Sequence, residues 1–321
     1  DTFGFDDDAA GERLARALMA RQARGVSVHV LRDPVGSGDT PAAFFDRLSA
    51  SGVQVHTGQA SEGDAQRHRK LLIVDGHTAF VGAIPTGRGH AANVSTARDT
   101  DLRLRGPVVA DLQRLFLASW ADQAGPPLPA RQHFPAPVVA GSQTVRAIAS
   151  HPDDDPHPAQ ALLLQAIDGA RRSIHLGNAS FMADGALLDA LETAARRGVA
   201  VHLVLPGHGD SWLRLQAGRG HYARLLRAGV HLHERRGTIV HARTVLVDGA
   251  WAMLGSSSLD WDAASDHHEL HTVVEGRSFG ASLQALFDRD IAASAEIDAR
   301  VWGDRSTDQR LREAFGQAWT W

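Results

Sequence analysis

The stretch HRKLLIVDGHTAFVG, from His68 to Gly82, returns as HARTVLVDGAWAMLG, from His241 to Gly255. Each copy runs histidine, one residue, a cation, four residues, Asp-Gly, and a short apolar run that closes on glycine. The offset is constant, since 241 minus 68 and 255 minus 82 both give 173. Paired imidazoles, each with a cation two residues on, indicate one site assembled from two halves of a duplicated fold.

The segments around the two copies also repeat. Apolar residues recur at helical spacing in GERLARALMARQAR and AAFFDRLSASG, and β-branched strands follow at Val26–Asp33 and VQVHTG. The second half repeats this order, with HYARLLRAGVHLHE matching FFDRLSASGVQVHT. Two α/β halves are therefore predicted, residues 1–124 and 143–321, joined by the proline- and glycine-rich linker 125–142.

The halves differ at their starts. The second opens with a helix and a strand, Ala161–Asn178, for which the first has no counterpart. A sheet that lacks an inner strand leaves backbone groups unpaired. We therefore expect further residues before residue 1, so the absence of a targeting or membrane segment in this sequence decides nothing. The polar segment 84–99 is predicted to be a long surface loop.

Composition narrows the classes of function. The chain has 321 residues, a formal charge of −4 and a pI near 6.5, which gives no global basic footprint for nucleic acid. It has no cysteine, which excludes disulfides, thiolate metal sites and cysteine catalysis. Eighteen histidines make any single histidine uninformative.

The repeated stretch suits phosphoryl transfer. In an extended strand, residues i and i+2 face the same side, so His68 points with Lys70 and His241 with Arg243. One histidine can attack phosphorus while the other protonates the leaving oxygen, and the cations hold the remaining oxygens, without a metal or other cofactor. Zinc is disfavoured because no metal-binding spacing is organised around either copy. The HLH at 231–233 is predicted to be a strand face, and His267-His268 to lie in a loop or at the surface.

The Asp-Gly pairs leave two interpretations open. Asp75 and Asp248 stand where a strand turns back, and Asp-Gly is a strong hairpin signal. Each aspartate is either a turn residue or a supporting residue of the site.

In these motifs the sequence resembles the phospholipase D superfamily, whose mark is HxKxxxxD followed by G-S/G-x-N, once per half. The flanks RDTDLRLRGPVVADLQRLFLASW, GSSSLD and HEL resemble bacterial cardiolipin synthases. The resemblance implies two tandem α/β/α halves with pseudo-two-fold symmetry and mixed, mostly parallel sheets. It also implies one active site on their seam and a covalent phosphohistidine, with no required metal.

Carried over to this sequence, the resemblance makes His68 the nucleophile, His241 the general acid and base, and Lys70 and Arg243 the phosphate-binding cations. Asp99 and Glu269, each seven residues before a glycine, Gly106 or Gly276, match the carboxylates that orient a catalytic imidazole.

Several positions depart from the family pattern. Arg243 replaces lysine, and both asparagine positions are lost, to Pro85 and Ser258. Ala83 has no hydroxyl, whereas Ser256 retains one. The first half thus keeps its lysine but loses polar support, and the second does the reverse.

The leading hypothesis is a phospholipid phosphodiesterase or phosphatidyltransferase, monomeric and peripheral to a bacterial membrane. Its substrate would be a glycerophospholipid, and its acceptor glycerol, phosphatidylglycerol or water. Two alternatives remain, a nuclease of the same superfamily and a degenerate member that binds phosphate without catalysis.

Overall fold

The structure is a computed structural model, and it describes residues 1–58, 66–82, 98–123, 125–129, 133–152, 154, 156–209, 211–238, 240–256 and 267–319. The chain divides into two compact units. The first comprises Asp1–Ser95, Asp101–Gly141 and Asp266–Leu270, and the second comprises Thr96–Thr100, Ser142–Ser265 and His271–Trp321. Each unit therefore includes a five-residue segment from the half of the sequence that builds the other.

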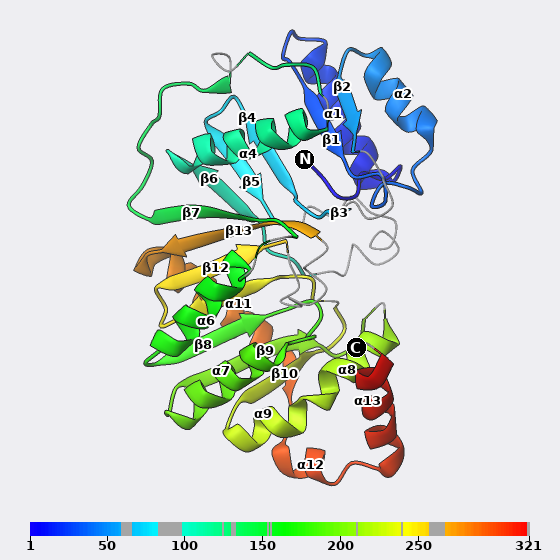
Figure 1. Cartoon of the computed structure of the whole chain (residues 1–321). Helices are drawn as coiled ribbons and strands as arrows, with labels where there is room; N and C mark the ends of the chain where they lie inside the picture. The colour runs from blue at the N-terminus through cyan, green and yellow to red at the C-terminus, as the bar shows by residue number, and fades with distance from the viewer. Residues whose placement is uncertain are drawn as a thin grey trace. The chain divides into compact units, whose positions relative to one another are not determined.

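The second unit is built on a sheet with the strand order β14-β10-β9-β8-β11-β12-β13, and β7 pairs with β13 (Figure 1). The strands are β7 (Thr144–Ser150), β8 (Ser173–Gly177), β9 (Ala200–Pro206), β10 (His231–Arg235), β11 (Thr244–Val247), β12 (Trp251–Gly255), β13 (His267–Glu275) and β14 (Ser294–Glu296). The helices are α6 (Pro158–Gly169), α7 (Gly185–Arg196), α8 (Trp212–Gly220), α9 (Tyr222–Ala228), α11 (Arg277–Ala292), α12 (Ala299–Gly303) and α13 (Thr307–Trp319). The first residues of β13, up to Leu270, belong to the first unit.

Alternation along the strands decides which side chains enter the core of this unit. On β8, Ile174 and Leu176 are fully buried in the main apolar cluster, which also contains residues of α6, α7 and α9. His175, between them in sequence, points to the opposite face and contacts Phe287 of α11. Helices therefore cover both faces of the sheet (Figure 1), as the predicted α/β/α arrangement requires.

The expectation of mostly parallel sheets is wrong for this unit. The sheet is mixed, but only the β8–β9 and β9–β10 pairs, among those with an assigned register, run parallel. The pairs β8–β11, β11–β12, β12–β13 and β10–β14 run antiparallel. The Asp-Gly turn accounts for one of these antiparallel pairs, because it returns the chain as a hairpin from β11 to β12.

The first unit contains α1 (Ala9–Gln22), β1 (His29–Arg32), α2 (Ala42–Ala50), β2 (Gln54–Thr57), β3 (Gln66–Arg67), β4 (Leu71–Val74), β5 (Thr78–Val81), β6 (Leu102–Arg105) and α4 (Val108–Asp122). Helix α1 begins after Asp8, whose carboxylate accepts the N–H groups of Ala10 and Gly11. Strands β1 and β2 form a parallel pair, and β4, β5 and β6 form a separate antiparallel sheet. Strand β3 pairs with the start of β13.

The two units differ at the centre of their sheets. In the second unit β8 joins β9 to β11, whereas in the first unit β1 and β4 have no complete strand between them among the described residues. Asp1 and Leu71 exchange two backbone hydrogen bonds, and Thr2 bridges to Arg32. In the first unit, Asp1 and Thr2 therefore occupy the place that the end of β8 occupies in the second unit.

Most of the helices and strands predicted from the sequence are confirmed, with ends shifted by a few residues. The predicted loop 84–99 lies mainly outside the described residues, as do Ala83, Pro85 and Ser258. Within the described part of the chain, no helix combines the length and the apolar character needed to span a bilayer.

Candidate active site

The first candidate cluster consists of His68, Lys70 and Glu269 and lies within the first unit. The stretch from His68 to Lys70 is extended chain between β3 and β4, so both side chains point to one side. Nδ1 of His68 lies 3.1 Å from Oε1 of Glu269, and Nζ of Lys70 lies 3.3 Å from Nε2 of His68. Glu269 and Lys70 are buried, whereas the His68 side chain keeps 19% of its surface exposed.

These contacts favour one tautomer of the His68 imidazole. A carboxylate can only accept and an ammonium can only donate, so Nδ1 carries the proton toward Glu269 and Nε2 presents its lone pair toward Lys70. Nε2 is therefore the ring atom available as a nucleophile. The negative charge of Glu269 also stabilises an imidazolium on His68.

Contacts of the backbone and of the Arg69 side chain hold His68 and Glu269 in place. The N–H of His68 donates to the carbonyl of His268, 3.1 Å away, beside the β3–β13 pair. Arg69 is almost fully buried, donates to the Ser119 hydroxyl at 2.9 Å and reaches the carbonyl of Glu269 at 3.4 Å. Burial lowers the pKa of Arg69 to about 10. Because this value is still well above 7, the guanidinium remains charged at neutral pH. Arg69 is thus a structural clamp between α4 and the Glu269 backbone.

Two aromatic rings lie beside His68 that the sequence analysis did not predict. Phe3 meets the His68 ring edge-on at 4.8 Å between centroids, and Nζ of Lys70 lies 5.9 Å from the Phe3 centroid. His267 lies 5.8 Å from His68 on another side. The prediction of a loop for His267-His268 is wrong, because both residues begin strand β13 and are half-buried. No local signal ties either ring to His68, since the contacts join distant segments.

The second candidate cluster consists of His241, Arg243 and Asp99 and lies within the second unit. Nδ1 of His241 lies 2.7 Å from Oδ2 of Asp99, and both side chains are mostly buried. The other Asp99 oxygen accepts the N–H of Thr100 at 2.7 Å. Arg98 holds this segment by a two-pronged ion pair with Asp290 of α11, at 2.8 and 3.1 Å.

The two clusters share one construction. The N–H of His241 donates to the carbonyl of Arg98 at 2.9 Å, as the N–H of His68 donates to that of His268. In both clusters the carbonyl belongs to the residue immediately before the orienting carboxylate. Each carboxylate comes from the half of the sequence opposite its histidine, on the two segments that change unit. Asp99 and Glu269 thus stand at the ring nitrogens of the two predicted histidines.

The cations occupy matching positions with different environments. Lys70 immediately precedes β4 and is only 8% exposed. Arg243 immediately precedes β11, is half-buried, and its carbonyl accepts the N–H of Gly255 at 3.3 Å. A planar guanidinium therefore replaces a compact ammonium in the second cluster.

Asp75 and Asp248 lie at the opposite ends of β4 and β11 from the histidines. Both adopt positive φ, 54° and 53°, and each is followed by a glycine in the same region, as in a hairpin turn. The Asp248 carboxylate accepts the N–H groups of Arg171, Arg172 and Ser173 at the start of β8. Burial opposes its ionisation, but these backbone donors outweigh burial and lower the pKa of Asp248. A catalytic part for either aspartate remains a prediction.

The glycines that close the repeated stretch are required by close packing. A Cβ at Gly82 would fall 2.0 Å from Asp101, and one at Gly255 would fall 2.2 Å from the His271 ring. Ser256, the residue after Gly255, is buried. Its predicted support of the second cluster stays a prediction.

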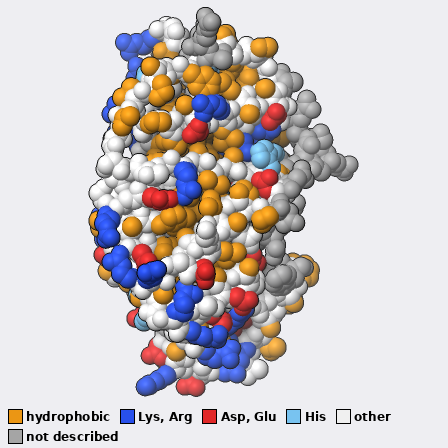
Figure 2. Space-filling view, turned by 60° about the vertical axis from the view of Figure 1, so that its left-hand side comes forward, with side chains coloured by type: hydrophobic (Ala, Val, Ile, Leu, Met, Phe, Trp, Pro, Cys, Tyr) orange, Lys and Arg blue, Asp and Glu red, His pale blue; other side chains and the backbone are white. Residues whose placement is uncertain are grey.

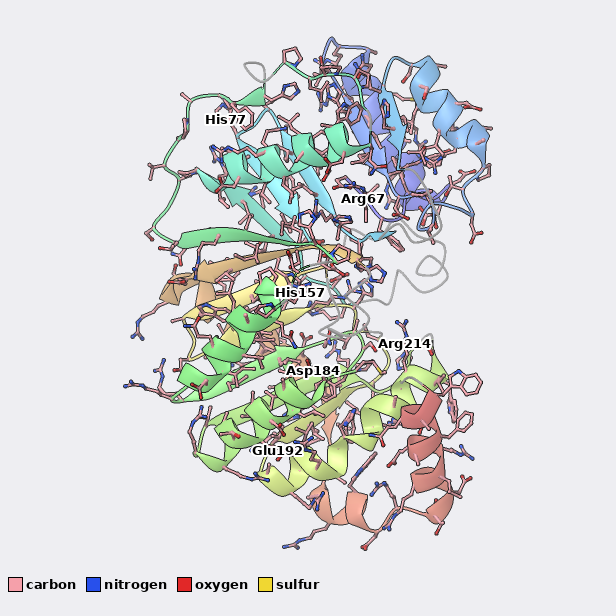
Figure 3. The ribbon with its side chains drawn as sticks, viewed as in Figure 1. Arg67, His77, His157, Asp184, Glu192 and Arg214 are labelled. Carbon is pink, nitrogen blue, oxygen red and sulfur yellow. The ribbon has the colours of Figure 1, made fainter. Side chains whose placement is uncertain are left out.

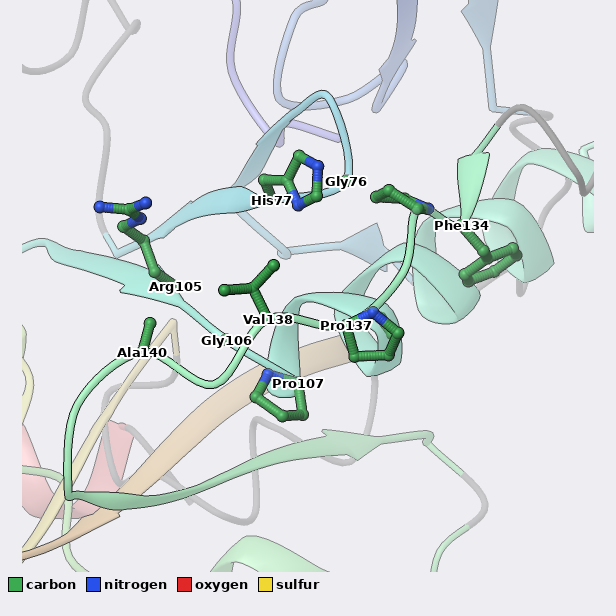
Figure 4. A pocket seen from close by; sticks show the side chains of 11 residues that line it. Gly76, His77, Arg105, Gly106, Pro107, Phe134, Pro137, Val138 and Ala140 are labelled. Carbon is green, nitrogen blue, oxygen red and sulfur yellow. The ribbon is translucent and has the colours of Figure 1, made fainter.

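One pocket of the first unit lies away from its cluster. It is lined by Arg105, His77, the start of α4 and the Phe134–Ala140 segment (Figure 4). His77 belongs to the Asp75-Gly76 turn, whereas Arg67 directly precedes His68, and Figure 3 shows the two labelled residues well separated. Since β4 rises about 3.3 Å per residue, the turn lies at least 13 Å along the chain direction from Lys70.

The second unit also contains a ladder of histidines on the α11 face of its sheet. His175, His202 and His231 are direct neighbours on β8, β9 and β10, with ring centroids 5.1 and 4.7 Å apart. Nε2 of His233 lies 3.2 Å from Nδ1 of His202. Burial, and after it the charges of the neighbouring imidazoles, lower the pKa of His202 to about 4. Among the described residues, no group of three or more such side chains has the geometry to hold a metal ion.

Comparison with known proteins gives concordant matches. Residues 2–119 and 163–291 match the family described as cardiolipin synthase, PLD-like domain. Cardiolipin synthase A of Pseudomonas aeruginosa strain LESB58 is 31% identical over 319 residues, which cover 96% of this chain and 64% of the relative. The Yersinia pseudotuberculosis enzyme of the same name is 30% identical, over 94% of this chain and 65% of the relative. The chain thus spans less than two thirds of these relatives.

A solved structure shows the same fold. The phosphatidylserine synthase of Haemophilus influenzae Rd KW20 superposes with a TM-score of 0.74 at 11% identity, over 99% of this chain and 86% of that one.

Proposed function

Since the chain belongs to the family of cardiolipin synthases with a phospholipase D-like domain, we propose that it is a phosphatidyltransferase or phosphodiesterase acting on glycerophospholipids. The observation that carries the proposal is the repeated pairing of a histidine with a largely buried carboxylate, in which each histidine has a cation two residues later in the sequence. This pairing is what a two-step transfer of a phosphoryl group requires.

In the first step, Nε2 of His68 attacks phosphorus. An N–P bond forms, the P–O bond to the departing alcohol breaks, and His241 supplies the proton to the leaving oxygen. Lys70, now beside Nε2, and Arg243 bind the non-bridging oxygens as negative charge shifts onto them. The carboxylate of Glu269 stabilises the positive charge that His68 acquires.

In the second step, the roles of the imidazoles reverse. His241 takes the proton of an incoming hydroxyl, the new P–O bond forms, and the N–P bond to His68 breaks. With water as the acceptor the product is phosphatidate. With glycerol the product is phosphatidylglycerol with an exchanged head group, and with phosphatidylglycerol it is cardiolipin. The protein would work as a monomer at a membrane surface and require no metal or cofactor.

A nuclease function has less support in the electrostatics. Figure 2 shows cationic and anionic side chains intermingled on the face that it presents, without a broad basic track. The formal charge of −4 points the same way. DNA is therefore the comparison substrate in the test and not the favoured one.

The test is a transfer assay with phosphatidylglycerol, an excess of isotopically labelled glycerol, and EDTA. We expect labelled cardiolipin or exchanged phosphatidylglycerol, at a rate that EDTA does not change, and no product with His68→Asn. If the folded protein left phosphatidylglycerol, phosphatidylcholine and DNA all untouched, the enzyme proposal would fail in favour of the degenerate, phosphate-binding alternative. Cleavage of DNA alone would replace it with the nuclease.

A further inference from the structure

Helix α13 is amphipathic, but unlike an ordinary surface helix it buries polar and small residues and exposes its large apolar side chains. Its buried residues are Glu313 and Gly316, and Gln317 beside them reaches His221 at 3.5 Å. Its large apolar side chains face outward, since Leu311 is 65% exposed, Phe315 54% and Trp319 69%. A surface helix of a globular protein normally buries such residues against its core.

The inward face explains how the helix is held without its apolar residues. Helix α13 packs against α8 (Figure 1), and a Cβ at Gly316 would fall 2.6 Å from the Ala217 backbone. Glu313 receives three hydrogen bonds of 2.8 to 3.1 Å from the Arg305 guanidinium. Close backbone packing and a buried ion pair therefore fix α13, and the outward apolar residues contribute little to this packing.

The outward residues form one continuous stripe. Leu311, Phe315 and Trp319 follow at intervals of four, which places them along one side of the helix over about 12 Å. The rings of Phe315 and Trp319 stack with centroids 5.9 Å apart. Trp212, at the start of α8, is also 48% exposed. We call Leu311, Phe315 and Trp319 the α13 stripe.

The charges around the stripe are biased toward cations. Asp308 pairs with Arg312, and Glu313 with Arg305, so both acids of α13 are neutralised. Arg310 of α13 and Arg214 of α8 have no carboxylate partner within the described residues. Figure 3 shows Arg214 near the first turn of α8. Arg310 and Arg312 directly precede and follow Leu311, so they lie on its two sides.

We propose that the α13 stripe docks the protein on an anionic phospholipid surface. Tryptophan and phenylalanine side chains favour the boundary between head groups and acyl chains, and flanking arginines attract anionic lipid. A stripe of this size immerses apolar side chains without spanning the bilayer. The inference rests on the proposed function, because a lipid-embedded substrate is the reason for the protein to meet such a surface.

The experiment measures binding to vesicles of phosphatidylglycerol and phosphatidylcholine by sedimentation. The test variants are Leu311→Glu/Phe315→Glu and the uncharged Leu311→Ser/Phe315→Ser. The matched control is Val35→Glu/Val139→Glu, which places the same charges on exposed valines of the first unit. We expect both test variants to lower the partition coefficient at least about tenfold, because the buried apolar area is lost, and the control to match the unchanged protein.

Two further measurements separate the possible failures. Turnover of a short-chain phosphatidylglycerol below its micelle concentration needs no surface, so every variant should keep it. Loss of turnover in all proteins, the unchanged one included, would reject the proposed function, while the vesicle results would still decide the docking surface. Vesicle binding unaffected by either test variant would overturn the inference. Sedimentation velocity showing a dimer that only the test variants dissociate, with vesicle binding intact, would assign the stripe to a second copy instead.

Discussion

In the first cluster, Nζ of Lys70 stands 3.3 Å from the His68 ring, whereas in the second an arginine occupies the matching position. The carboxylates differ as well, glutamate at 3.1 Å from His68 and aspartate at 2.7 Å from His241. The backbone construction around them is the same. A duplicated scaffold thus carries two chemically unequal clusters, and we propose that His68 attacks while His241 transfers the proton.

Replacing the carboxylates should have the largest effect. Glu269→Gln and Asp99→Asn remove the charge that fixes the tautomer and stabilises the imidazolium, and each should lower kcat/KM by about 10²- to 10⁴-fold on phosphatidylglycerol. Glu275→Gln is the control, since that glutamate lies on the same strand in an exposed ion pair with Arg146.

A substrate with a p-nitrophenol leaving group separates the two carboxylates. Such a leaving group departs without a proton, so the burst of p-nitrophenol should survive Asp99→Asn and be slowed strongly by Glu269→Gln. Equal losses in the two variants would contradict the division of labour between the clusters.

Exchanging the cations should have a smaller effect and one that differs between clusters. Lys70 is buried beside His68, so the larger guanidinium of Lys70→Arg displaces the imidazole and should lower kcat about 10- to 100-fold. Arg243→Lys keeps the charge in a half-buried site and should change kcat by less than about tenfold. Steady-state kinetics with phosphatidylglycerol and with the p-nitrophenol substrate measure kcat for both variants. A greater loss from Arg243→Lys than from Lys70→Arg would reverse the comparison.

The hairpin turns extend the comparison to stability. Asp248 accepts three backbone N–H groups at the start of β8, and the first unit has no such complete strand among its described residues. Asp248→Asn should therefore lower the free energy of unfolding by about 1 kcal/mol, and Asp75→Asn by less. Asparagine tolerates positive φ, so backbone strain is matched.

Acid should remove the contribution of Asp248. Its pKa is lowered in the folded protein, so the stabilisation is present above the ordinary pKa of 3.8 and is lost as the pH falls through the folded value. Urea unfolding at pH 7 and in acid checks this. If the free energies of unfolding of Asp248→Asn and Asp75→Asn still differed in strong acid, the stabilisation assigned to the Asp248 carboxylate would be refuted.

The histidine ladder should give the smallest effect. His202 has a folded pKa of about 4 against an ordinary 6.5, so the unfolded chain binds the proton more readily and stability falls as the pH drops from 6.5 toward 4. His202→Gln should flatten this dependence of Tm on pH. His29, at the corresponding position of the first unit, packs against Trp120, and His29→Gln should flatten it less. Identical slopes for both variants would remove the distinction between the units.

The sequence predicted the duplicated α/β architecture and the relationship to cardiolipin synthases, and both are confirmed. Repetition at a constant offset identified His68 and His241, and the alignment on Gly106 and Gly276 identified Asp99 and Glu269. Their catalytic roles remain proposals.

Other features depend on tertiary contacts that the sequence does not encode locally. Which carboxylate meets which histidine follows from two short segments that change unit. The contact of Phe3 with His68 joins residues 65 positions apart. The α13 stripe has the periodicity of a helix, but periodicity alone cannot tell that the apolar side faces outward.

The most direct test is the location of the covalent intermediate. The protein is mixed with the p-nitrophenol ester of phosphatidate, quenched during the burst at alkaline pH, where phosphohistidine persists, and digested for peptide mass spectrometry. We predict the phosphatidyl group on the peptide that contains His68, in the unchanged protein and, more abundantly, in His241→Asn. An adduct on His241, or one that forms undiminished in His68→Asn, would contradict the assignment.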